Sequence, residues 1–92
     1  MEQVEELTKI DNFLGRPYNV ILFNDNVHSF DQVIGQIIKA IKCNAAHASA
    51  LAMEAHSKGE AIVFVGGLER CELVESILAS PPAALRTNIQ EA

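Results

Sequence analysis

Three adjacent polar residues, Asn24, Asp25 and Asn26, form the group in this sequence that is best suited to bind a ligand. They directly follow the apolar, β-branched run 18–23, which is typical of a buried strand. Amide and carboxylate groups in a loop held by rigid elements are often binding groups. The same side chains also close turns by bonding to nearby backbone groups, so their spacing alone leaves both interpretations open.

Other side chains offer little for catalysis or metal binding. Three histidines, His28, His47 and His56, suggest a metal site. Their spacing to one another and to Cys43 lacks the close pairs of structural zinc sites. An acid–base pair of Asp25 and His56 would suit a small hydrolase, but no glycine-flanked serine or reactive thiol supplies a nucleophile. We therefore predict no metal, no cofactor and no enzymatic activity.

A helix is predicted directly after the polar group. Ser29 and Gln32 form a capping-box pattern, which marks the start of a helix. Apolar residues then recur at helical spacing and predict one core-facing stripe. The stripe consists of Phe30, Val33, Ile34, Ile37, Ile38 and Ile41. The polar residues between them, including Gln36, are expected on the opposite face.

A second helix is predicted between Asn44, a favourable N-cap, and Gly59, which supplies the left-handed position that ends a helix. Its apolar face is unusually small and consists of Ala48, Leu51, Ala52 and Ala55. Alanine favours helix but fills little volume, so either another element packs very closely here or this face lines a cavity. His56 lies on the last turn, at helical spacing from two of these alanines.

The remaining pattern completes the fold. Residues 60–65 are predicted as a second strand, residues 68–78 as a third helix and residues 85–90 as a half-exposed third strand. Three short strands should join one sheet with helices on one face, so we predict an α/β (α+β) two-layer sandwich of order βααβαβ. Residues 1–17 are predicted to be a flexible N-terminal arm, either passive or partner-binding, and residues 18–92 the domain.

Composition excludes several classes of function. With 92 residues, of which 49% are hydrophobic, the chain is expected to form one small globular domain. A net charge of −5 and scattered basic residues give no footprint for nucleic acid. No apolar run approaches the ~20 residues of a membrane span, and the N-terminus resembles neither a secretory signal nor a transit peptide. Two cysteines are too few for a disulfide framework, so we expect free thiols in the cytoplasm.

Two stretches together form a specific pattern. The run V-I-L-F-N-D-N-V-H-S-F-D-Q-V places an N-D pair after an apolar strand, and A-M-E-A-H-S-K-G-E-A-I-V places an H-x-x-G before another. At this fixed separation the combination resembles the ClpS family, the small adaptors of AAA+ Clp proteases. The final A-L-R-T-N-I-Q-E-A is similar to the family's closing strand. The resemblance covers about residues 17–92, with a shortening near residues 81–82.

The resemblance implies an adaptor that recognises N-terminal degrons and delivers their proteins to a Clp AAA+ unfoldase of the ClpA or ClpC type. Such degrons carry a free α-amine and a bulky first residue, namely Phe, Trp, Tyr or Leu. The α-amine ligands fall on Asn24 and His56, with Asp25 and Asn26 beside them. The side-chain pocket falls on Phe23, His28, Phe30, Val33, Ala52, Ala55 and Leu85. The surface facing the unfoldase includes Glu69, and we expect the adaptor to be a monomer.

The chemistry of these residues agrees with the resemblance. An α-ammonium offers three donors and no acceptor, as a lysine head group does. It therefore requires acceptors such as the amide oxygen of Asn24, the carboxylate of Asp25 and an unprotonated imidazole nitrogen of His56. The small apolar face of the second helix would provide the hole for the first side chain.

Several residues depart from the family pattern. Asn26 stands where the family usually has aspartate, so one negative charge near the ammonium is missing. His28 replaces a small hydroxyl residue, and Phe30 replaces a gating methionine. Ala52 and Ala55 replace larger apolar residues. We therefore expect an altered pocket floor and gate that favour large aromatic first residues over leucine.

Two other functions remain open on sequence alone. One is a non-catalytic interaction module resembling the C-terminal domain of the bacterial ribosomal stalk protein, which has a similar small α/β architecture. The other is the hydrolase that would use Asp25 and His56. The adaptor requires Asn24 and His56 to converge beside an apolar hollow, whereas the interaction module does not.

Overall fold

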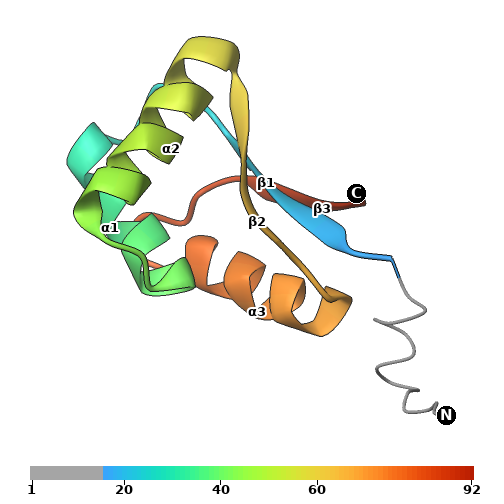
Figure 1. Cartoon of the computed structure of the whole chain (residues 1–92). Helices are drawn as coiled ribbons and strands as arrows, with labels where there is room; N and C mark the ends of the chain where they lie inside the picture. Colours follow the sequence, from blue (N-terminus) through green and yellow to red (C-terminus); the bar gives the residue numbers. More distant parts are fainter. Residues whose placement is uncertain (1–15) are drawn as a thin grey trace, which may run out of the picture.

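The computed structural model describes residues 16–92, so the predicted arm lies almost wholly outside the described residues. In chain order the elements are β1 (Tyr18–Phe23), α1 (Phe30–Ile41), α2 (Ala45–Lys58), β2 (Glu60–Gly66), α3 (Leu68–Leu78) and β3 (Thr87–Glu91), as Figure 1 shows. This order confirms the predicted βααβαβ arrangement of an α+β fold. The strands form one sheet in the order β2-β1-β3, and both pairs are antiparallel.

The core lies between the sheet and the three helices. Val20 and Leu22 of the central strand β1 are almost completely buried, with 0% and 1% of their surface exposed. On β2, Phe64 lies opposite Val20 and Ala61 lies opposite Leu22, so these side chains share one face of the sheet. The strand that leads into Asn24 is therefore fixed by neighbours on both sides and by the helices above it.

The predicted helix caps are present and set the ends of the helices around the candidate site. The Ser29 hydroxyl accepts the backbone N–H of Gln32 at 3.2 Å, and the Gln32 side chain accepts the backbone N–H of Ser29 at 2.9 Å. Asn44 caps α2 by accepting the N–H of His47 at 2.8 Å. Gly59 ends α2 with φ of 93°, a left-handed conformation that suits glycine.

Two side chains on α1 lie elsewhere than predicted. Gln36 is 2% exposed rather than on the polar face. Its amide nitrogen donates to the carbonyl oxygens of Ile77 and Ser80, both at 3.0 Å. A buried amide is tolerated here because its N–H groups find acceptors in these carbonyl oxygens, which also accept the backbone N–H groups of Ser80 and Ala84. Phe30 was predicted on the core-facing stripe but is 41% exposed, since it is the first residue of α1 and extends past the core.

The part of the chain that the structure describes also bears on the predictions about thiols, metals and membranes. Cys43 is half-buried and Cys71 is buried, and both are free thiols. No group of three His, Cys, Asp or Glu residues between 16 and 92 is arranged to hold a metal ion. No helix in this part is both long enough and apolar enough to cross a membrane.

Candidate functional site

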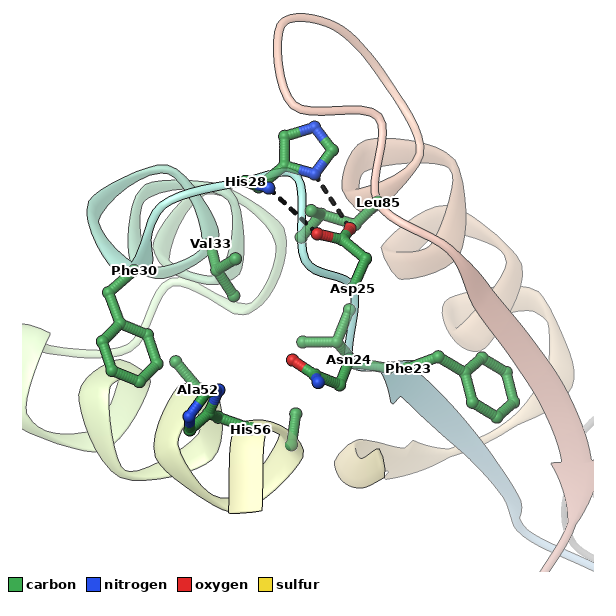
Figure 2. Close-up of a pocket in the computed structure, with 11 residues that line it drawn as sticks. Phe23, Asn24, Asp25, His28, Phe30, Val33, Ala52, His56 and Leu85 are labelled. Carbon is green, nitrogen blue, oxygen red and sulfur yellow. Dashed lines mark hydrogen bonds and ion pairs between the residues drawn. The ribbon is translucent and has the colours of Figure 1, made fainter. Parts of the chain in front are cut away.

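A cavity opens where the end of β1, the start of α1, the last turns of α2 and the segment before β3 meet (Figure 2). Its empty space, counted together with open solvent at the mouth, is about 380 Å³. The lining residues are Leu22, Phe23, Asn24, Asp25, His28, Phe30, Val33, Ala52, Ala55, His56 and Leu85.

The floor of the cavity is apolar and exists because α2 presents alanines to it. Ala52 and Ala55 are each 3% exposed, and both lie on the face of α2 that turns toward the core. Val33 from α1 and the buried Leu85 from the segment before β3 close the other sides. The sequence left close packing and a cavity as alternatives for this small face, and at these two alanines the structure shows a cavity.

Leu22 also lines the cavity, and sequence reasoning did not assign it to the site. It was placed only in the buried strand. The signal that could have found it is the two-residue period of a strand, because Leu22 points to the helix side two residues before Asn24.

A backbone hydrogen bond brings Asn24 and His56 to the same rim. The N–H of Asn24 donates to the carbonyl oxygen of Gly59 at 3.0 Å, which ties the loop after β1 to the end of α2. His56 lies on that last turn. Figure 2 shows the Asn24 amide directed into the cavity on the side of His56. Within residues 16–92 neither side chain has a hydrogen-bonding partner, so both can bind a ligand.

The Asp25 carboxylate is already hydrogen-bonded within its own loop. Oδ1 accepts the backbone N–H groups of Val27 and His28, both at 3.0 Å, and Oδ2 lies 2.9 Å from Nδ1 of the His28 ring. Partial burial would raise the pKa of the Asp25 carboxyl, but the hydrogen bonds from His28 and Val27 outweigh it and lower the pKa below its usual value. Asp25 therefore stays ionised at neutral pH.

Asp25 does not pair with His56, as the hydrolase hypothesis would require. The ring partner of Asp25 is His28, whereas His56 packs against Phe30 with ring centroids 5.4 Å apart and an interplanar angle of 68°. Such edge-to-face contacts are favourable and fix the orientation of both rings. His56 is thus held at the rim of the cavity by an aromatic contact rather than by a carboxylate.

Phe23 lines the cavity, but its ring points away from the centre in Figure 2. The guanidinium of Arg86 lies 4.9 Å from the centroid of that ring, a cation–π arrangement. The same guanidinium lies 3.5 Å from the backbone carbonyl oxygen of Asn24. Phe23 therefore helps to form the wall without placing its ring in the predicted side-chain pocket.

Asn26 and Glu69 are the two predicted site residues that lie outside the cavity. Asn26 is exposed and borders a second, shallower hollow at the mouth, which we call the outer hollow. The outer hollow is lined by Asp25, Asn26, His28, Phe30 and His56. Glu69 lies in the first turn of α3, is exposed and borders neither hollow.

Comparisons with known proteins show the family and the fold to which the chain belongs. The family model of the ATP-dependent Clp protease adaptor protein ClpS matches residues 15–82, which is more than half of the chain. The solved structure of Agrobacterium tumefaciens ClpS2 bound to L-phenylalaninamide superimposes with a TM-score of 0.78 at 18% identity. It covers 84% of this chain and 98% of that chain, and at this identity it shows the shared fold.

Two curated relatives are much larger proteins. The chain is 34% identical over 61 residues to the E3 ubiquitin-protein ligase UBR2 of Homo sapiens, which is 66% of this chain and 4% of the ligase. It is 37% identical over 57 residues to the ligase UBR1 of Drosophila melanogaster, which is 62% of this chain and 3% of the ligase. The chain thus spans a small part of these ligases.

The chain belongs to the ClpS family of protease adaptors and is non-catalytic, as that family is.

Proposed function

We propose that this domain binds the N-terminal residue of substrate proteins and presents these proteins to a Clp AAA+ unfoldase. The first residue would be Phe, Tyr, Trp or Leu with a free α-amine. The observation that carries this proposal is the position of Asn24 and His56 at the rim of an apolar cavity, where neither side chain has a hydrogen-bonding partner within residues 16–92. A ligand that joins a cation to an apolar side chain at one carbon atom matches this arrangement.

The rim suits an ammonium group. The side-chain oxygen of Asn24 and an unprotonated nitrogen of His56 can each accept one of its N–H bonds. Asp25 supplies a negative charge nearby, because its lowered pKa keeps it ionised. Since its own oxygens are held by His28 and Val27, Asp25 acts on the ammonium through charge more than through direct hydrogen bonding.

The cavity suits a bulky side chain. Its floor consists of small or branched apolar residues that leave space beneath the rim, and Phe30 borders its mouth. The ligand in the solved structure of the Agrobacterium tumefaciens protein, L-phenylalaninamide, combines a free α-amine with an aromatic side chain. We infer that the same combination of groups is the ligand here, with large aromatic first residues preferred over leucine.

Membership of the ClpS family supports delivery to an unfoldase as the second part of the proposal. We propose a partner of the ClpA or ClpC type that contacts the exposed residue Glu69 at the start of α3, together with the arm formed by residues 1–17. Because Glu69 borders neither hollow, the protein could hold a degron and the unfoldase at the same time. We further expect the adaptor to work as a monomer in the cytoplasm.

The test is a binding titration with two labelled peptides that share one sequence beginning with Phe. One peptide has a free α-amine and the other is N-acetylated, which removes the charge and two donors. We expect the acetylated peptide to bind at least about tenfold more weakly, since a charge-assisted hydrogen bond in a partly buried site contributes roughly 1.5–3 kcal/mol. Equal binding of both peptides would refute amine recognition and favour a plain interaction module.

A further inference from the structure

The outer hollow is a surface that the proposed binding of the first residue does not use. It shares Asp25, His28, Phe30 and His56 with the cavity, so it lies directly at the cavity mouth. If the first residue of a substrate occupies the cavity, the chain that follows must leave through this mouth. The outer hollow is therefore the surface that meets the second residue of the substrate.

His28 lines the outer hollow, and its ring is held in place by a carboxylate. Its side chain is 18% exposed, and Nδ1 is held 2.9 Å from the Asp25 carboxylate. Because an ionised carboxylate can only accept, Nδ1 carries a hydrogen and donates to Asp25 in both charge states of the ring. The second ring nitrogen, Nε2, therefore accepts a hydrogen bond when the ring is neutral and donates one when it is charged. In Figure 2 this nitrogen is directed away from Asp25 and out of the cavity.

We propose that His28 makes the adaptor select its substrates by the charge of their second residue, and that pH sets this selection. This inference rests on the proposed function. When His28 is neutral, Asp25 leaves a net negative charge at the mouth, which favours a basic second residue. When His28 is protonated it cancels that charge and offers a donor, which favours an acidic second residue.

The other charged groups around the outer hollow do not reproduce this behaviour. Besides Asp25 and His28, the ionisable side chain that lines it is His56. The elements that form the mouth also carry Asp31 in the first turn of α1, Lys58 in the last turn of α2, 4.0 Å from Glu54, and Arg86 before β3. Ordinary carboxylates, lysines and arginines keep their charge between about pH 6 and 8, so they contribute a constant background. Mutation of His28 separates its effect from any effect of His56.

The experiment compares three free-amine peptides that begin Phe-Glu, Phe-Lys and Phe-Ala and are otherwise identical. The quantity measured is the ratio of the Phe-Glu to the Phe-Lys affinity, because effects on the first residue cancel in this ratio. Between about pH 8 and 6 we expect the ratio to rise on the order of fivefold, the size of an interaction between partly exposed charges. The rise should shrink in high salt.

The matched variants are His28→Asn and His47→Asn. The asparagine amide at position 28 can still donate to Asp25 but cannot become charged. His28→Asn should therefore lose most of the pH dependence of the ratio, whatever its effect on the affinity for Phe-Ala. His47 is exposed at the start of α2 and borders neither hollow, so His47→Asn should behave as the unmodified protein.

A second measurement needs no mutation. Linkage requires that a peptide which senses the charge of His28 also shifts the titration of His28 in return. A fivefold change in the affinity ratio corresponds to a difference of about 0.7 pH unit between the His28 titration midpoints in the two complexes. The reason is that a midpoint difference of one pH unit corresponds to a tenfold change in affinity. The midpoints can be read by NMR from the ring protons.

The outcomes separate the two levels of the proposal. If the Phe-Ala peptide does not bind, the proposed function fails, and this inference fails with it. If Phe-Ala binds but the ratio changes equally in the unmodified protein and in His28→Asn, or the His28 midpoints coincide in the two complexes, only the inference is refuted.

Discussion

The volume of the cavity can be tested by replacing Ala52 with methionine. Ala52 is 3% exposed and lines the floor, so a methionine there should extend its thioether into the space below the rim. Burial of a phenylalanine side chain contributes about 1.5–3 kcal/mol to binding. If the ring of the bound phenylalanine can no longer reach the floor, about half of this contribution is lost. A Phe-initiated peptide should then bind roughly fivefold more weakly, a loss of about 1 kcal/mol.

A Leu-initiated peptide should lose less, because its side chain is shorter and does not reach as far. The preference for Phe over Leu should therefore fall or reverse in Ala52→Met. The matched control is Ala50→Met, the same substitution at an exposed position of the same helix. Because the new side chain enters empty space, the free energy of unfolding should change by less than the ~1–3 kcal/mol typical of an overpacked core.

The assay is fluorescence anisotropy with Phe- and Leu-initiated peptides, together with urea unfolding of each variant. An unchanged Phe-to-Leu ratio in Ala52→Met would show that Ala52 does not border the bound side chain. A similar loss in Ala50→Met would show that methionine acts through α2 as a whole. A large loss of stability without a change in ratio would place Ala52 in the packed core instead of the cavity floor.

Three further perturbations test the rim, the loop and the arm. Asn26→Asp should strengthen binding of a Phe-initiated peptide by at most about 1 kcal/mol, because position 26 is exposed in the outer hollow; calorimetry at low and high salt should show a gain that salt removes, and equal affinities would contradict it. The pKa of Asp25 is lowered in the folded state, so its carboxylate stabilises the fold above its usual pKa of about 3.8, and this contribution is lost as the pH falls through the lower folded value. Asp25→Asn should accordingly lower the free energy of unfolding at neutral pH and have little effect in strong acid, whereas an equal loss at both would mean that charge is not involved. Deletion of residues 1–16 should leave peptide binding intact, because the cavity is built from residues between 22 and 85, and should abolish unfoldase-dependent degradation; normal degradation would make the arm passive.

Local signals explain why much of the fold could be predicted. The capping box at Ser29 and Gln32, the N-cap at Asn44 and the left-handed Gly59 depend on neighbours within a few residues, and all three features occur as predicted. The strand order β2-β1-β3 was not predicted, because pairing joins segments far apart in the chain. The pattern of residues within a strand does not show which other strand it pairs with.

At the candidate site, too, features that depend on near neighbours in the chain were easier to predict than contacts between distant segments. The alanine-rich face of α2 predicted either close packing or a cavity, because the small volume of alanine is visible in the sequence. The position of Gln36 was predicted wrongly, since its partners at the end of α3 lie 41 to 44 residues away. The pairing of Asp25 with His28 was also missed, although the two are only three residues apart. A turn signal was visible there, but a turn leaves open which side chains it brings together.

The loop between β1 and α1 is fixed before any ligand arrives. The Asn24 N–H bonds to Gly59, Asp25 holds two backbone N–H groups of its own loop, and Ser29 is locked by the capping box. The conformational entropy of ordering this segment is therefore lost during folding and not during binding. Since association usually incurs the cost of ordering loops and side chains, a ligand of this site keeps more of its contact energy as affinity. A site preorganised in this way can recognise something as small as a single terminal residue, whatever sequence follows further along the chain.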